Sequence, residues 1–448
     1  MNSNYCTAIY KITFLTSNLL HFIICFSDSK ICGGLRLFYV YNKSISVIMS
    51  SISDCFNNNF MFLKYFGIWP GKEVTKQYKY YSVIFIFTTL IAYNLLLTLN
   101  LAYTPRKMEL IIREVIFLFT EVAVMAKVVM IMRMRKKLLT VFDILDCEHF
   151  QGNDHIAKQI VHDHVTKYRS YWKMYVILCH FVYFCRFSVP VLVHFIFKSS
   201  IELPLFKYYF LDVSVVQKYF ISLYLYQSFG MYVHMTYNIN VDTFIAGLIL
   251  MAIMQVRVIN YYFRILKADI IEQLERSVDK KVIAQLNVKL IHYEILLKYC
   301  SAIQEIMSVT LFIQFGMTSA TICFVLCGLL LPSTTEFLIF MISYLFTMVL
   351  QIFVPAWLGS ILIYEVIYVF ILLYLPVKTR TQDIVFGEWI PRSERYKRSI
   401  KLFVERANRQ IQITGCGLFP LSLGTFTSIL KTAYSFFTLI RNFQEPQD

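Results

Sequence analysis

Long apolar blocks separated by charged stretches dominate the chain. Seven of them reach the roughly twenty residues that a helix needs to cross the hydrocarbon core of a membrane. They are residues 81–103, 109–132, 171–197, 217–255, 308–331, 335–360 and 421–440. The repeated strand-length alternation of a membrane barrel is missing from the sequence. The pattern therefore predicts an all-α polytopic membrane bundle of seven transmembrane helices.

The stretch from residue 264 to residue 307 has a different pattern, in which charged residues are interspersed with a regular apolar series. Apolar side chains recur every four positions, at Leu266, Ile270, Leu274, Val278, Val282 and Leu286. This spacing predicts an amphipathic helix. Its apolar face needs another subunit or the chain's own bundle as a partner; a solvated extension of two spans is the alternative.

The composition agrees with an integral membrane protein. Hydrophobic residues make up 57% of the chain and charged residues 16%, against about 45–50% and about 25% in soluble proteins. The net charge of +15 fits basic inner loops. Nucleic-acid binding is not expected, because no Lys/Arg run is interleaved with stacking aromatics. The eleven cysteines are scattered, so no extracellular disulfide framework is expected.

The basic residues beside the spans predict the orientation. With the N-terminus inside, the outer segments hold few of them: Arg106, Lys107, Lys198 and Lys207. The inner segments are richer, at residues 133–137, 257–267 and 392–401. Inner loops of membrane proteins carry the excess of Lys and Arg. We therefore expect an intracellular N-terminus and an extracellular C-terminus, the reverse of a G-protein-coupled receptor.

Five motifs along the chain carry a resemblance to a known family. They are FGIWPG (66–71), LPLFKYYFLDVS (203–214), LFIQFG (311–316), QIFVPAWLGSIL (351–362) and FPLSLGTFTSILKTAYSFFTLIR (419–441). In this order, on a chain with seven predicted spans, they resemble the insect odorant receptors over about residues 49–441.

The resemblance implies a ligand-gated cation channel subunit for olfaction, located in the plasma membrane of sensory neurons. It would bind a small volatile ligand and assemble with a shared olfactory co-receptor in a heterotetramer surrounded by membrane lipid. The last helix of each subunit would line the pore. The inner ends of the other helices would form a cytosolic helical anchor domain.

The predicted last span has one small, polar side. Residues with hydroxyl groups recur there at three- and four-residue spacing: Ser428, Thr432, Ser435 and Thr438. A pore helix needs such a face, because it must tolerate water. The resemblance adds Tyr434, Phe437 and Arg441 as pore positions. Arg441 would oppose cation entry if it faced inward, and the alternative is that it snorkels outward to the membrane interface.

A ligand pocket is expected in the outer half of the second, third, fourth and sixth spans, lined mainly by aromatic residues. The candidates by depth are Phe117, Thr120, Tyr183, Phe187, Tyr224 and Tyr344. The chain has 31 Tyr and 40 Phe, so packing within the bundle is the alternative role of each. Shape and dispersion would supply most of the affinity for a volatile ligand.

Ionisable residues inside spans are costly and usually paired. Glu121, Lys127, Arg186 and Asp242 lie inside predicted spans, and Lys431 lies near the middle of the last one. Glu121 and Arg186 have similar depths in neighbouring antiparallel spans. We therefore predict an intramembrane ion pair between them, which would either hold the helices together or serve function.

A polar loop is predicted at residues 147–164, and it contains four histidines: His149, His155, His162 and His164. Their spacing matches no standard zinc pattern, so a solvated loop without metal is expected. The sequence also lacks the serine-hydrolase, metalloprotease and phosphate-loop motifs. We therefore expect no cofactor and no enzyme activity.

Two segments depart from the family. Residues 1–48 do not resemble it; their apolar stretch at 12–27 fits a signal peptide, but a cleaved signal would conflict with the predicted orientation. We expect Met49 to be the natural start. The apolar run at 366–375 is too short for a span. In the family GSILIYE continues into DIVFGEWI, so residues 366–382 are predicted to be an insertion from a retained intron.

These predictions divide the chain into six parts. They are a non-native extension (1–48), a cytosolic segment (49–80), six helices with the ligand pocket (81–360), the last intracellular loop (361–420), the pore-lining helix (421–441) and an extracellular tail (442–448). The alternative functions are a gustatory receptor channel of the same architecture, a metabotropic receptor and a transporter. A transporter is less favoured because the chain shows no inverted repeat.

Overall fold

The computed structural model of the chain describes residues 51–71, 74–198, 202–272, 279–332, 334–374, 398 and 411–444. The predicted extension at 1–48 and the second part of the predicted insertion, residues 375–382, lie outside this described part. Residues 51–448 form a compact unit of their own.

The described chain is almost entirely helical. Before the long helices come η2 (Ile52–Phe56), α3 (Asn57–Tyr65), α4 (Lys76–Ile86), the π-helical η3 (Phe87–Ile91) and α5 (Ala92–Tyr103). The remaining helices are α6 (Met108–Arg133), α7 (Arg135–Leu145), α8 (Glu148–Gln151), α9 (His155–Phe197), α10 (Val213–Lys218), α11 (Phe220–Glu272), α12 (Asp279–Gly328), α13 (Thr335–Tyr374) and α15 (Leu423–Gln444). The strands β1 (Thr414–Gly415) and β2 (Phe419–Pro420) form a short antiparallel pair.

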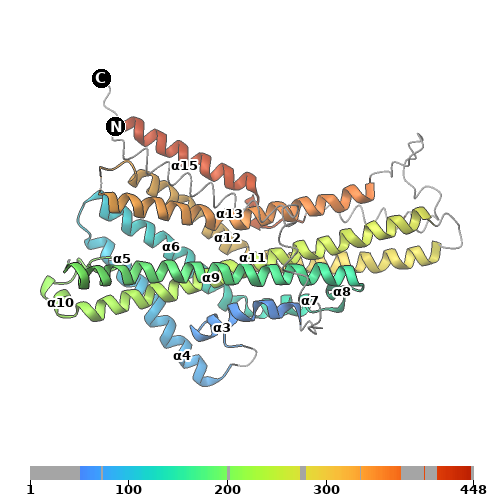
Figure 1. Ribbon diagram of the computed structural model, residues 1–448, viewed down its shortest axis with the longest axis horizontal. Helices are drawn as coiled ribbons and strands as arrows, with labels where there is room; N and C mark the ends of the chain where they lie inside the picture. The colour runs from blue at the N-terminus through green and yellow to red at the C-terminus, as the bar shows by residue number, and fades with distance from the viewer. Residues whose placement is uncertain are drawn as a thin grey trace. The chain divides into compact units, whose positions relative to one another are not determined.

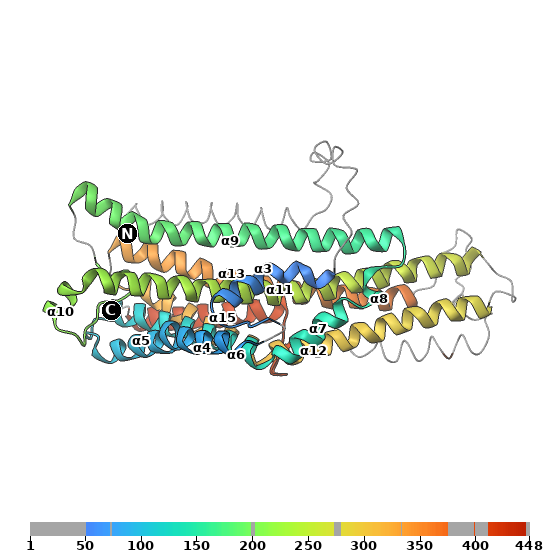
Figure 2. The same ribbon diagram turned by 90° about the horizontal axis from the view of Figure 1, so that it is seen from below.

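Helix α11 is the central element of this unit. It packs against α6, α9, α12 and α13, while α6 packs against α12, and α15 packs against α12 and α13. Figures 1 and 2 show α9 and α11 running side by side along most of their length. Most side chains of α11 between residues 233 and 263 are buried. A helix that is apolar all round is expected in such a central position.

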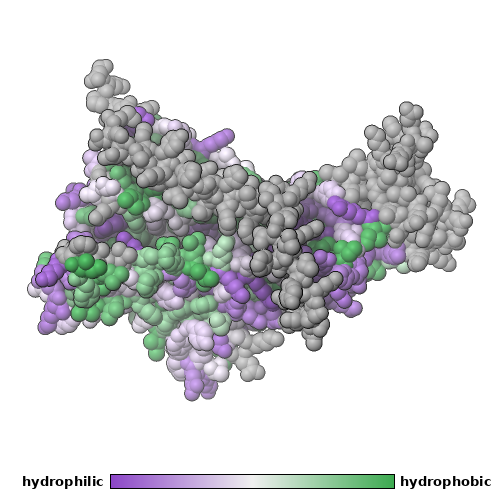
Figure 3. Space-filling model, viewed as in Figure 1, coloured by the Kyte–Doolittle hydropathy of each residue, from purple (hydrophilic) through white to green (hydrophobic). Residues whose placement is uncertain are grey.

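Five helices in the described part are long and apolar enough to cross a membrane: Lys76–Tyr103, Met108–Arg133, Phe220–Leu266, Ile283–Gly328 and Phe337–Val369. They overlap five of the seven predicted spans. Of the other two, residues 171–197 lie within α9, and residues 421–440 coincide with α15 from Leu423 onwards. Figure 3 shows apolar surface around α5, α9 and the α10 end of α11, and a more polar surface towards α7 and α8.

A buried polar network fixes the start of the described chain on the central helices. The Asn59 amide donates to the Asn240 carbonyl at 3.0 Å and to the Thr243 hydroxyl at 2.8 Å. The Tyr168 hydroxyl of α9 donates to Asn59 Oδ1 at 3.0 Å. Gly247 of α11 makes room for the Tyr168 ring, because a Cβ there would lie 2.5 Å from it. The network therefore joins α3, α9 and α11.

The end of α3 is closed by hydroxyl groups as well as by a glycine. Gly67 has a φ of +77°, and the Ile68 amide donates back to the Leu63 carbonyl at 2.9 Å, which is a Schellman motif. The carbonyls of residues 64, 65, 66 and 67 accept hydrogen bonds from the hydroxyls of Tyr78, Tyr81, Tyr237 and Ser82, respectively. The terminal carbonyls of a helix have no partner inside it. These side chains satisfy them and attach α3 to α4 and α11.

Two local predictions were wrong. The polar stretch at 147–164 is mostly helix, because α9 begins at His155, where Asp154 Oδ1 accepts from the Ala157 amide at 2.7 Å. This N-cap outweighs the polar composition that suggested a loop. The apolar series between Leu266 and Leu286 does not lie on a single helix, since α11 ends at Glu272 and α12 begins at Asp279. Leu266 and Leu286 are buried on these two helices.

The beginning of the predicted insertion continues α13. The helix runs through residue 366 to Tyr374, and Val366 and Val369 are buried. Just before them, the Glu365 carboxylate lies 2.7 Å from Arg257 Nε of α11. The first residues assigned to the insertion are therefore packed as part of the bundle.

Candidate functional site

Three of the predicted ligand residues meet between α6 and α13. The Thr120 hydroxyl of α6 and the Tyr344 hydroxyl of α13 are hydrogen bonded to each other. The Phe117 ring, one turn away, lies 5.9 Å from the Tyr344 ring in an edge-to-face arrangement and 5.8 Å from the Phe340 ring. These residues form an aromatic wall with both hydroxyls already partnered.

The other three meet between α9 and α11. The Tyr183 and Phe187 rings of α9 are 4.4 Å apart. The Tyr183 hydroxyl donates to the Ser228 carbonyl at 2.8 Å, and the Tyr224 hydroxyl donates to the Phe187 carbonyl at 3.0 Å. This second wall is therefore tied across two helices in the same way as the first.

Arg186 connects the two walls. Its guanidinium lies 5.9 Å from the centroid of the Phe340 ring of the first wall, within the range of a cation–π contact. It also donates to the Pro204 carbonyl at 3.4 Å. We call the two walls together with Phe340 and Arg186 the aromatic site.

The predicted pair between Glu121 and Arg186 is replaced by another one. Glu121 Oε2 lies 2.5 Å from Nδ1 of His234 on α11. The second ring nitrogen, Nε2, lies 2.7 Å from the Thr89 carbonyl in η3. Both ring nitrogens of His234 are therefore engaged, one by the Glu121 carboxyl group and one by a backbone carbonyl. A buried charged residue can pair only with a group on the helix that its own side chain faces. On α6, Glu121 faces α11 and therefore pairs with His234.

A second charged pair joins the same two helices. Lys127 Nζ of α6 is fully buried and lies 2.5 Å from Asp242 Oδ1 of α11. It also donates to Asn238 Oδ1 at 2.5 Å, and the Gln351 amide of α13 donates to Asp242 Oδ2 at 3.1 Å. Both charges were identified from the sequence, but not their partnership. The network compensates charges that would otherwise be costly among apolar helices.

A loop between α9 and α10 (the α9–α10 loop, residues 202–212) packs on one end of the aromatic site. The Leu205 amide donates to Gln227 Oε1 at 3.1 Å, and the Gln227 amide donates to the Phe206 carbonyl at 2.9 Å. The Tyr209 amide donates to Asn100 Oδ1 of α5 at 2.9 Å. These bonds hold the loop on α5 and α11.

One buried cluster joins this loop to the aromatic site. Its members come from α5, α6 and the loop: Tyr93, Leu97, Phe117, Leu205, Phe206 and Tyr208. Phe340 and Tyr344 pack against it. The sequence reasoning missed Tyr93, Tyr208 and His234. An available signal for His234 was a histidine within an apolar block; nothing distinguished the two tyrosines from the many others.

The predicted pore residues lie on α15. The hydroxyls of Thr432, Ser435 and Thr438 donate to carbonyls of their own helix, and Ser428 supplies one of those carbonyls. Tyr434 is exposed, and its ring lies 6.1 Å from the Phe437 ring. Ala433 is buried, and Arg441 is in the last turn. One face of α15 thus packs on the bundle, while much of the rest is exposed.

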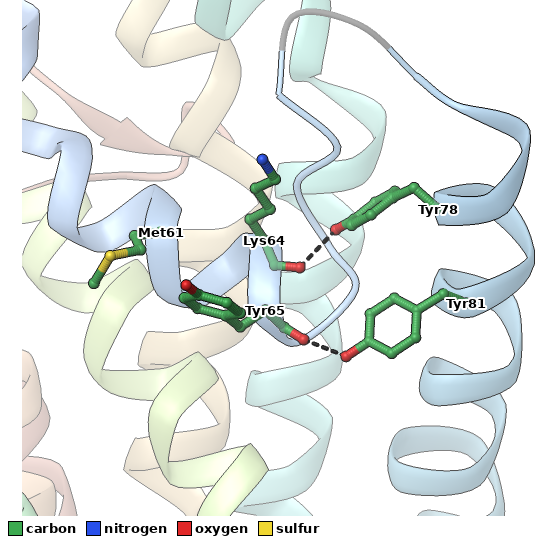
Figure 4. Close-up of a pocket in the computed structure, with 5 residues that line it drawn as sticks. All are labelled: Met61, Lys64, Tyr65, Tyr78 and Tyr81. Carbon is green, nitrogen blue, oxygen red and sulfur yellow. Dashed lines mark hydrogen bonds between the residues drawn. The ribbon is translucent and has the colours of Figure 1, made fainter.

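The hollow drawn in Figure 4 lies elsewhere. It has a volume of about 370 Å³ and is lined by Met61, Lys64, Tyr65, Tyr78 and Tyr81. Figure 4 shows the Tyr78 and Tyr81 hydroxyls of α4 pointing at the carbonyls that end α3. This hollow contains none of the predicted ligand residues.

The four histidines of residues 147–164 do not form a metal site. Within the described part of the chain, no group of three or more His, Cys, Asp or Glu residues could hold a metal ion. His164 is buried and uses both ring nitrogens: Nδ1 lies 2.8 Å from the Ile160 carbonyl and Nε2 lies 3.0 Å from Arg257 Nη1.

Comparison with known proteins points to one family. The family described as 7tm Odorant receptor matches residues 107–369 and 386–434. Odorant receptor 67c of Drosophila melanogaster is 27% identical over 146 residues, which are 32% of this chain and 33% of that protein. Odorant receptor 10 of Aedes albopictus is 22% identical over 200 residues, 44% of this chain and 49% of that protein. The matched stretches span between a third and a half of these relatives.

The fold is similar to that of a solved structure over nearly its whole length. The structure of the insect olfactory receptor OR5 from Machilis hrabei in complex with eugenol has a TM-score of 0.72. The similarity covers 88% of this chain and 99% of that one, at 14% sequence identity. A second structure of OR5 gives a TM-score of 0.71. This likeness concerns the fold.

Proposed function

The chain belongs to the insect odorant receptor family, whose members are multi-pass membrane receptors and not enzymes, and from this we propose that it is the odorant-binding subunit of a ligand-gated cation channel. The resemblance seen in the sequence is thereby confirmed, as is the helical membrane bundle with several long apolar helices. Seven spans, an intracellular N-terminus and an extracellular C-terminus are part of the proposal.

The observation that carries the proposal is the aromatic site. It gathers residues of four helices, α6, α9, α11 and α13, around rings that offer dispersion contacts to a small apolar molecule. The related fold of OR5 from Machilis hrabei was solved with eugenol, a small aromatic volatile. We propose that this chain binds its volatile ligand between the two walls of its aromatic site.

Helix α15 supports the channel part of the proposal. Its exposed surface carries Ser428, Thr432 and Ser435 of the hydroxyl series as well as Tyr434 and Lys431, and Thr438 is half-buried. A helix with polar, exposed side chains among apolar helices is suited to face water in a pore shared by several subunits. We propose that the co-receptor supplies the other subunits of a heterotetramer in the plasma membrane of sensory neurons.

The test is current recording in cells that express this chain together with the co-receptor. A panel of volatiles should evoke an inward cation current in the co-expressing cells. The co-receptor alone is the control and should stay silent to the same volatiles. If surface labelling finds this chain on the plasma membrane and no volatile of the panel evokes a current, the proposal is wrong.

A further inference from the structure

Two buried tyrosine hydroxyls beside the aromatic site have no hydrogen-bond partner within the described part of the chain. They belong to Tyr93 of α5, which is 1% exposed, and Tyr208 of the α9–α10 loop, which is 4% exposed. A buried hydroxyl without a partner destabilises the folded state, because it gives up its hydrogen bonds to water. Two such groups in one cluster therefore call for a cause.

Three neighbouring tyrosines have hydrogen-bonded hydroxyls. Tyr226 donates to the Thr88 carbonyl at 3.0 Å and Tyr183 to the Ser228 carbonyl at 2.8 Å. Tyr344 is bonded to Thr120. Tyr93 and Tyr208 differ from these three neighbours in their unbonded hydroxyls.

Both rings are held in place by their packing. The Tyr93 ring occupies the space left by Gly230, where a Cβ would lie 2.4 Å from the ring, and it meets the His234 ring edge-to-face at 4.7 Å. Tyr208 packs between Phe206 and Phe210, at 5.1 Å and 5.7 Å between ring centroids. Its loop is attached by the Gln227 and Asn100 hydrogen bonds. Packing therefore fixes the positions of both rings, and the Gln227 amide beside Tyr208 is already bonded to the loop backbone.

The two tyrosines and Phe117 of the aromatic site belong to the same buried cluster. Phenol groups donate one hydrogen bond each, and a carbonyl oxygen has two lone pairs that can accept both. We propose that Tyr93 and Tyr208 are the hydrogen-bond donors of the binding site and that its ligands are volatiles with a carbonyl oxygen, such as ketones and esters. The inference rests on the proposed function, because it names the chemical class of that ligand.

The experiment compares isosteric pairs of volatiles on cells that express this chain with the co-receptor. A 2-alkanone is paired with the 2-methylalkane of the same chain length, and acetophenone with isopropylbenzene, so that a methyl group replaces the oxygen. The ketones should evoke current at concentrations at least about tenfold lower than the hydrocarbons need, since the loss of such a hydrogen bond weakens affinity on the order of tenfold. This comparison needs no variant.

The variants Tyr93→Phe and Tyr208→Phe should each remove most of the potency difference between the ketone and its hydrocarbon partner. Tyr226→Phe is the matched control, because its hydroxyl is already bonded to a carbonyl; the ratio of ketone to hydrocarbon potency should stay as in the unmodified chain. Surface labelling confirms that each variant reaches the membrane.

The outcomes separate the two proposals. Equal potency of ketones and hydrocarbons would show that the hydroxyls bind water or nothing, and would overturn this inference while leaving the odorant-gated channel intact. Phe variants that weaken both classes equally would overturn it as well. A silent response to every volatile would overturn the proposed function, and this inference with it.

Discussion

His164 shows how a single buried residue ties two helices together. Its ring accepts a hydrogen bond from Arg257 of α11 and contacts the Ile160 carbonyl of its own helix. Burial lowers the pKa of His164 from 6.5 to about 4, and the positive charge of Arg257 acts in the same direction. The folded protein therefore keeps this imidazole neutral where an unfolded chain would protonate it.

This shift predicts a loss of stability in mild acid. The folded pKa lies below the unfolded one, so the unfolded chain binds the proton more readily as the pH falls from 6.5 towards 4. At pH 5 the difference amounts to roughly 2 kcal/mol. His164→Gln, which keeps an acceptor for Arg257, should lose less stability between pH 7 and pH 5 than the unmodified protein. Thermal unfolding of the detergent-solubilised protein at both pH values measures this.

His162→Gln is the control for that comparison, because His162 is exposed two positions earlier on α9. It should show the same acid sensitivity as the unmodified chain. If His164→Gln were as acid-sensitive as the His162 variant, His164 would not be the group that titrates.

Residue-level prediction succeeded for the kind of interaction and failed for the partner. The cost of a charge inside an apolar span correctly indicated that Glu121 and Lys127 would be paired. Depth along the spans then suggested Arg186 for Glu121. Depth does not fix the rotation of a helix about its own axis, and α6 turns both of these side chains towards α11, where His234 and Asp242 lie.

Among the elements, α15 depends on a glycine in α13. A Cβ at Gly359 would lie 2.1 Å from the Leu421 carbonyl, which precedes α15. Next to it, the Ser360 hydroxyl accepts from the Leu423 amide at 2.8 Å. The backbone that leads into the proposed pore helix can approach α13 this closely only because residue 359 has no side chain.

Gly359→Ala should therefore destabilise the protein by about 1–3 kcal/mol, as overpacking usually does. Gly316→Ala in α12 is the matched control, since a Cβ there meets nothing within 4 Å, and alanine is the better helix former. Its stability should be equal or slightly higher. Thermal unfolding of both purified variants measures the difference; equal midpoints would show that the contact at residue 359 is not needed.

The long apolar helices could be predicted from hydropathy alone. A run of about twenty apolar residues is long enough to cross a membrane as a helix, and a helix pairs all of its backbone polar groups internally. Helix ends were harder to predict. Asp154 is the N-cap of α9, within a stretch whose polar composition suggested a loop. The family match omits residues 370–385, and Val366 and Val369 are buried. The insertion predicted at residues 366–382 stays a prediction, and its first residues, up to Tyr374, continue α13.

At the scale of the whole molecule, the order of five motifs was enough to identify the family, and the fold agrees with that of OR5 from Machilis hrabei. The binding chemistry was not accessible in the same way. Six ligand residues were chosen by depth, and the structure distributes them over two walls, with Arg186 of α9 in contact with Phe340 of the first wall. Which hydroxyls are unpartnered follows from packing in three dimensions, and a single sequence does not contain it.

The central claim is that this chain forms a channel opened directly by its ligand. Outside-out patches excised from cells that express the chain with the co-receptor test it best, because the cytosolic nucleotides needed for G-protein signalling are washed away. A carbonyl-bearing volatile applied to the patch should still evoke a cation current. A response that is present in intact cells and lost in excised patches would contradict it.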